Sequence, residues 1–171
     1  MNKTVSLGEE CGNYDNIVLQ EAKNTHKYGK MFYLKDRIYL IQRNPSTSYN
    51  EWTSAKGEQQ LRLGLTADLK TELDNIEKAV ISKMPDLVFK THENGSLYLK
   101  FGKTCEKSVE SHGELQYVIE IYGFFVQNST GCTYFQMDLM EQQSTKVSFL
   151  NKPTALNYVP NSKTWDDSAK F

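Results

Sequence analysis

The chain has 171 residues, with 20 Lys plus Arg against 21 Asp plus Glu and a formal net charge of −1. This length fits one domain with short extensions, and it allows a hydrophobic core without disulfides or metals. No run approaches the roughly 20 apolar residues of a transmembrane helix, so we expect no membrane partner. The balanced charge excludes an overall polycation, although it does not exclude a local basic patch.

The near-zero charge is a cancellation between segments. Residues 1–22 are acidic and weakly patterned, and we expect an N-terminal extension there, with a flexible one as an option. Residues 23–150 form the expected domain, which opens with Lys23–Arg43, where six basic residues face one acid. Residues 151–171 contain two prolines and few periodic apolar residues, and they are typical of a C-terminal tail.

The first half of the domain predicts strands followed by one helix. Two strands, 31–34 and 37–41, would form a hairpin with Lys35 and Asp36 as its turn. Residues 44–60 have the composition of a loop, and Leu61, Leu63 and Leu65 alternate as in a strand. Residues 67–84 carry apolar side chains at helical spacing, with Thr66 as the expected N-cap and Pro85 just beyond the end.

The second half returns to strands, at 97–101, 115–125 and 134–139. Gly123 interrupts the longest of them and suggests a bulge of the kind that helps small barrels to close. One helix inserted in a strand-rich chain predicts a mainly β fold, an OB-like β-barrel with the helix packed on it.

The motifs of common enzymes are missing from the sequence. It has no phosphate-binding GxxxxGK[ST], no GxGxxG and no GxSxG. The three Cys are far apart and the three His are scattered, which argues against a disulfide framework and against a metal site. We therefore predict a protein that is not an enzyme, that has no cofactor or metal, and that resides in a reducing intracellular compartment.

The positive signal is the mixture of basic and aromatic residues. In the strand 37–43, Arg37, Tyr39 and Arg43 share one face, and Tyr98 and Lys100 repeat the combination later. Cations suit phosphates and aromatic rings suit unpaired bases, so the pattern favours single-stranded nucleic acid. The alternative is an ordinary solvent-exposed sheet face, where Lys, Arg and Tyr are also common.

Four stretches in a shared order resemble a known family. They are 28–34 (YGKMFYL), 38–45 (IYLIQRNP), 61–76 (LRLGL followed by LxxxLDxI) and 123–136 (GFF, then GCTYxQ). Together they resemble the OB-fold single-stranded DNA-binding proteins of large nucleocytoplasmic DNA viruses and their relatives in short-tailed phages. The chain departs from that pattern after Pro45, where it is rich in Ser and Thr, and at its end, where Lys163 and Lys170 offset Asp166 and Asp167.

The resemblance implies a protein that coats and protects unpaired strands in viral DNA replication, recombination or repair, at the sites of viral DNA replication in the host cytoplasm or nucleus. It implies replication proteins as partners, contacted through the tail that ends at Phe171, and it allows a homodimer. The candidate nucleic-acid-binding residues are Lys30, Lys35, Arg37, Arg43, Lys100 and Lys103 for phosphates, and Tyr33, Tyr39, Trp52, Tyr98, Phe124 and Tyr134 for bases.

Two questions stay open at this point. RNA is a possible ligand beside single-stranded DNA. An OB-like or sandwich domain can also serve as a structural or protein-interaction module without any nucleic acid, with its surface Tyr and Phe as contact anchors.

Overall fold

The computed structural model describes residues 2–23, 27–46, 49–92, 95–103, 105 and 114–145. Within these residues the strands are β1 (Lys3–Ser6), β2 (Leu19–Glu21), β3 (Gly29–Ser46), β4 (Tyr49–Thr53), β5 (Gln59–Gly64), β6 (Val88–Phe89), β7 (Ser96–Phe101), β8 (Glu114–Gln127) and β9 (Cys132–Thr145), and the helix is α1 (Ala67–Lys83). The prediction of a mainly β fold with one helix is confirmed. The expected tail, residues 151–171 with Phe171, lies outside the described residues.

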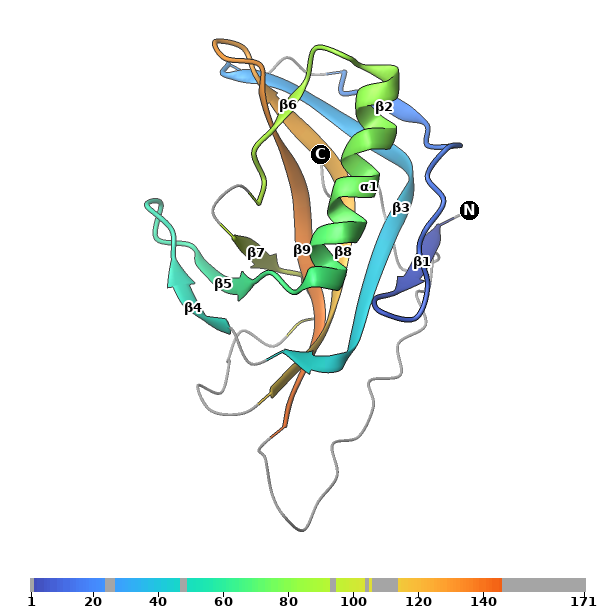
Figure 1. Cartoon of the computed structure of the whole chain (residues 1–171). Coiled ribbons are helices and arrows are strands. Elements are labelled where there is room, and N and C mark those ends of the chain that lie inside the picture. The colour runs from blue at the N-terminus through green and yellow to red at the C-terminus, as the bar shows by residue number, and fades with distance from the viewer. Residues whose placement is uncertain are drawn as a thin grey trace.

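The strands form one sheet in the order β1-β3-β8-β9-β7-β5-β4, with β2 added to β3 and β6 to β9. Its centre consists of the long antiparallel strands β3, β8 and β9, and α1 lies across one face of them (Figure 1). The strands β4, β5 and β7 extend to one side (Figure 1). The path described here runs from β1 to β4 and leaves the sheet open, so these pairings do not close a barrel.

The helix α1 forms where its apolar stripe predicts it. The Thr66 side chain accepts a hydrogen bond of 3.2 Å from the Leu69 N–H, which confirms the predicted N-cap. Leu69, Leu73 and Val80 are fully buried on the side that faces the sheet. Burial of each such side chain stabilises the fold by about 1.5–3 kcal/mol, so packing on the sheet fixes this helix more firmly than its intrinsic propensity does.

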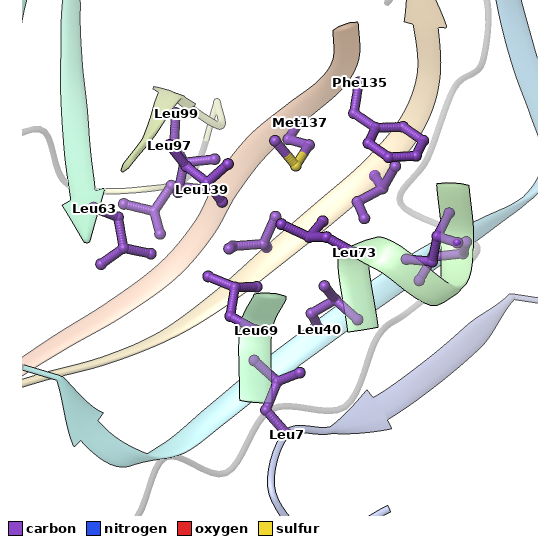
Figure 2. Packing of buried hydrophobic residues seen from close by; sticks show 14 of the residues in the cluster. Leu7, Leu40, Leu63, Leu69, Leu73, Leu97, Leu99, Phe135, Met137 and Leu139 are labelled. Atoms are coloured by element: carbon purple, nitrogen blue, oxygen red, sulfur yellow. The ribbon is translucent and has the colours of Figure 1, made fainter. Parts of the chain in front are cut away.

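The core lies between α1 and the sheet, and the alternation of each strand decides which side chains enter it. Leu61 and Leu63 of β5, and Leu97 and Leu99 of β7, are all fully buried. Leu63, Leu97 and Leu99 converge with Leu69 and Leu73 of α1 and with Leu40, Met137 and Leu139 of the central strands, as Figure 2 shows, and Leu61 belongs to the same cluster. The neighbouring residues on β5 and β7 therefore point to the opposite face of the sheet.

The predicted hairpin at Lys35 and Asp36 is wrong. Both residues lie inside β3, which runs without a turn past a register irregularity between Tyr33 and Ile38. A two-residue hairpin turn needs positive φ, and the described residues adopt positive φ only at glycines. Neither Lys35 nor Asp36 meets this requirement, so the chain stays extended and bends through the bulge.

The predicted loop at 44–60 also needs correction, because most of it forms the β4–β5 hairpin. Its turn is made by Gly57, which has φ +80 and donates an N–H hydrogen bond of 2.9 Å to the Ser54 carbonyl. Trp52 is thereby placed in a strand and paired with Gln60. The glycine supplies the left-handed conformation that the turn requires.

The expectation of a flexible N-terminal extension is not met by the described part of residues 1–22. Strand β1 pairs in parallel with β3, and Val5, Leu7 and Tyr14 are 2%, 2% and 5% exposed in the main core. Because these apolar side chains are buried against the domain, the acidic segment belongs to the same folded unit.

The bulge predicted at Gly123 is confirmed. The pairing of β8 with β9 shifts register between Ile121 and Gly123. The backbone of β3 crosses closely here, since a Cβ built on Gly123 would lie 2.3 Å from the Phe32 carbonyl oxygen. Only glycine allows this approach of the two strands.

Candidate nucleic-acid interface

An exposed aromatic pair lies on the outer face of β4, β5 and β7. Trp52 of β4 is 42% exposed and Tyr98 of β7 is 43% exposed. Their ring centroids are 5.3 Å apart and their planes meet at 61°, which is an edge-to-face contact. This geometry holds the two rings in a fixed relation and leaves ring surface open to solvent.

The register of the three strands builds this face from the sequence. Trp52 pairs with Gln60, which pairs with Lys100, while Arg62 pairs with Tyr98. Directly paired residues of antiparallel strands point to the same side. The leucines between them fill the core on the other side, so the polar and aromatic residues must face outward.

The charge on this face is positive. Arg62 and Lys100 are both exposed, and within the described ranges neither forms an ion pair with an acidic side chain. Lys103, also exposed, follows two residues after the end of β7. Aromatic rings beside exposed cations can stack on unpaired bases and attract backbone phosphates. We call Trp52, Arg62, Tyr98 and Lys100 the aromatic–basic face.

The structure brings together three of the residues predicted from the sequence, namely Trp52, Tyr98 and Lys100. Sequence reasoning missed Arg62, although its alternation with Leu61 and Leu63 was the available signal. Since the leucines were assigned to the core, Arg62 had to lie on the opposite face.

Three other candidates lie in the interior, and their assignment to an exposed interface needs correction. Arg37 is 4% exposed, while Tyr39 and Phe124 are fully buried. Phe124 stacks on Phe32 at a centroid distance of 5.2 Å, and Tyr39 packs with Ile41 in a second small core. Base stacking needs an open ring face, which neither aromatic offers in this fold.

The remaining candidates lie on β3 or on β9, and they do not join the aromatic–basic face. Lys30 and Lys35 are exposed, and the Lys30 ammonium lies 3.8 Å from the Glu21 carboxylate. Arg43 is half-buried and donates a hydrogen bond of 2.6 Å from Nη1 to Ser6 Oγ. Tyr33 and Tyr134 are half-buried, and burial raises the pKa of Tyr33.

Acidic residues make the central strands less suited to phosphates. Glu120 of β8 is paired in register with Asp138 of β9, on the face of the sheet that lies away from α1. Burial, followed by the charges of Asp138 and Glu120, raises the pKa of the neighbouring Tyr122. Glu120 is fully buried and pairs with Arg37, and Asp138 is also the register partner of Lys100, so an acidic residue borders the aromatic–basic face at β7. The aromatic–basic face is the better candidate interface because its two rings and its two cations are exposed.

Comparison with known proteins finds no family model that matches this chain, and no significant match among curated proteins or solved structures. Among the described residues, no helix is both long enough and apolar enough to cross a membrane.

Proposed function

We propose that this protein is a non-catalytic single-stranded DNA-binding protein that coats and protects unpaired strands in DNA replication, recombination or repair. The observation that carries the proposal is the exposed Trp52–Tyr98 pair with Arg62 and Lys100 beside it. The resemblance of the ordered sequence motifs to viral single-stranded DNA-binding proteins adds the viral setting. Replication proteins, a homodimer and RNA binding remain extensions of this proposal.

Stacking explains the preference for single strands. The bases of a duplex already stack on one another, whereas an unpaired base can place its face on an exposed ring at a gain of about 1–3 kcal/mol. Arg62 is paired in register with Tyr98. Its guanidinium would therefore lie close to the phosphates of a DNA strand whose base stacks on the Tyr98 ring. Lys100 extends the positive charge along β7, and sequence preference is expected to be weak.

Fluorescence titration with short oligonucleotides tests the proposal. The chain has two Trp, so Trp165→Phe leaves Trp52 as the only indole. We expect oligothymidylate to quench Trp52, duplex DNA of the same length to quench it less, and Tyr98→Ala to weaken binding by roughly 5- to 150-fold. Tyr28→Ala is the matched control, since Tyr28 is 66% exposed and lies just before β3, outside the aromatic–basic face. No binding to single strands at low salt would sink the proposal.

The salt dependence supplies a second measurement on the same face. For single strands the slope of log affinity against log salt is about −0.7 for each phosphate neutralised. Arg62→Gln and Lys100→Gln should each make the slope shallower by about 0.7, whereas Lys78→Gln, an exposed lysine on α1, should not. Unchanged slopes in the first two variants would show that Arg62 and Lys100 do not contact the phosphates.

One observation favours a second function. Strand β4 ends the sheet order, so an extended peptide can add to its outer edge beside Trp52. A protein-interaction module of this kind would use Trp52 and Tyr98 as anchors for a partner. The double variant Trp52→Ala with Tyr98→Ala separates the two functions. The second is correct if oligonucleotide binding persists in that variant while assembly with a protein partner fails.

A further inference from the structure

Two carboxylates and one imidazole meet between α1 and the segment that follows β6. Asp74 and Glu77 lie one turn apart on α1, and His92 approaches them after β6. The His92 side chain is only 10% exposed, and those of Asp74 and Glu77 are 38% and 17% exposed. The three groups offer ligand atoms that all lie within 4.8 Å of one another. Their spacing in the sequence gives no metal motif, because the fold alone brings His92 to the helix.

The imidazole is oriented by Asp74. His92 Nε2 lies 2.9 Å from Asp74 Oδ1, and because a carboxylate only accepts, the proton of the neutral ring belongs on Nε2. His92 Nδ1 then carries a lone pair and lies 3.3 Å from Glu77 Oε1. This nitrogen is buried and has no hydrogen-bond partner. Two acceptor atoms that face each other at this distance are satisfied either by a shared proton or by a metal ion that both coordinate.

The separation of these atoms fits a coordinated metal. Zinc binds imidazole nitrogen and carboxylate oxygen at about 2.0–2.2 Å, and a tetrahedral angle sets two such ligand atoms roughly 3.3 Å apart. A carboxylate that holds the far nitrogen of a metal-bound histidine is a common supporting contact, and Asp74 occupies that position. Lys70 Nζ lies 3.7 Å from Asp74 Oδ2, so the second oxygen of Asp74 has a partner on its own helix.

We propose that His92 Nδ1 and Glu77 Oε1 bind a divalent first-row transition metal such as zinc, with Asp74 orienting the imidazole and water completing the coordination. The ion would link α1 to the connection that leads into β7, the strand that carries Tyr98 and Lys100. The role is structural, and it does not depend on the proposed function.

Titration of the full chain with Zn²⁺ at neutral pH tests the site. We expect one equivalent to bind, and a hundredfold excess over the dissociation constant to raise the melting temperature by roughly 5–10 °C. His92→Gln and Glu77→Gln should each remove both effects, while Asp86→Asn, an exposed acid in the same connection, should keep them. Binding should weaken on acidification because the proton competes for the imidazole.

Cobalt distinguishes this site from the cysteines. All three Cys are free thiols, and Co²⁺ bound by thiolate gives an intense charge-transfer band that nitrogen and oxygen ligands do not give. We expect cobalt spectra without that band. The proposal is overturned if Zn²⁺ does not bind, if a thiolate band accompanies binding, or if folded His92→Gln and Glu77→Gln variants bind as well as the original chain. It is also overturned if only a proton, and no metal, stabilises the contact.

Discussion

Tyr14 Oη donates a hydrogen bond of 2.7 Å to Glu72 Oε2, which ties the N-terminal segment to the middle of α1. Glu72 is a carboxylate on the buried side of the helix, and its side chain also accepts from the Gly12 N–H at 3.3 Å. A buried carboxylate needs such donors, so this contact adds to the β1–β3 pairing and to the buried Val5 and Leu7 in holding the acidic segment on the domain.

The variant Tyr14→Phe should therefore lower the free energy of unfolding by about 1.5–3 kcal/mol. It removes a donor from a charged acceptor and keeps the ring that packs in the core. Urea unfolding followed by circular dichroism measures the change. Tyr28→Phe, at an exposed position, should leave stability within about 0.5 kcal/mol. Equal stability of the two variants would contradict a structural role for the Tyr14–Glu72 contact.

Stability should fall in alkaline solution because buried phenols resist ionisation. Burial raises the pKa of Tyr14, Tyr117 and Tyr122, and at Tyr14 the hydrogen bond to Glu72 adds to this effect. Below about pH 10 these phenols are protonated in both states, so their contribution is fully present. Above it the unfolded chain releases protons that the folded chain retains, and each phenol lowers the free energy of unfolding by up to about 1.4 kcal/mol per pH unit.

Spectrophotometric titration of tyrosinate checks this expectation. The three phenols should ionise only together with the loss of circular dichroism. Smooth titration of all ten tyrosines in the folded chain would show that the buried phenols are accessible to solvent.

Arg37 and Glu120 should be strongly coupled. Arg37 Nη1 lies 3.2 Å from Glu120 Oε1, and their side chains are 5% and 0% exposed. Arg37→Met should cost about 3–5 kcal/mol, because Glu120 would remain charged and buried beside Asp138. The double variant Arg37→Met with Glu120→Leu should cost less than the sum of the single variants. The exposed pair Lys30–Glu21 is the control, with an expected coupling below about 1 kcal/mol.

The same variants separate stability from binding at Arg37. Since the Arg37 side chain is only 5% exposed and pairs with Glu120, folded Arg37→Met should bind oligonucleotides as the original chain does. A loss of oligonucleotide binding without a loss of stability would show that Arg37 contributes to the interface.

Gly123→Ala should destabilise the fold by more than about 1 kcal/mol. The added methyl group would lie 2.3 Å from the backbone oxygen of Phe32, and a backbone atom cannot move aside as a flexible side chain does. Gly57→Asn is a suitable control, because nothing lies within 4 Å of a Cβ at Gly57 and Asn tolerates its positive φ. Thermal melting compares the two, and a larger loss at Gly57 would contradict the close crossing of β3 and β8.

Local chemistry predicted a large part of this fold. Helix α1 followed from its stripe and from Thr66, and the bulge at Gly123 followed from a glycine inside a strand pattern. The continuous course of β3 through Lys35 could not be read from the sequence. A continuous strand and a two-stranded hairpin have the same period-two alternation of apolar side chains in this segment. Only the pairing with β8 shows that the chain forms one continuous strand.

The candidate interface divides in the same way. The alternation of basic and aromatic residues with core leucines could be predicted, because period-two alternation sends neighbouring side chains to opposite faces. It did not determine which alternating residues reach solvent, since the sheet buries Tyr39 and leaves Tyr98 exposed. The contact of Trp52 with Tyr98 and that of His92 with Asp74 could not be predicted, because long-range packing sets both of them.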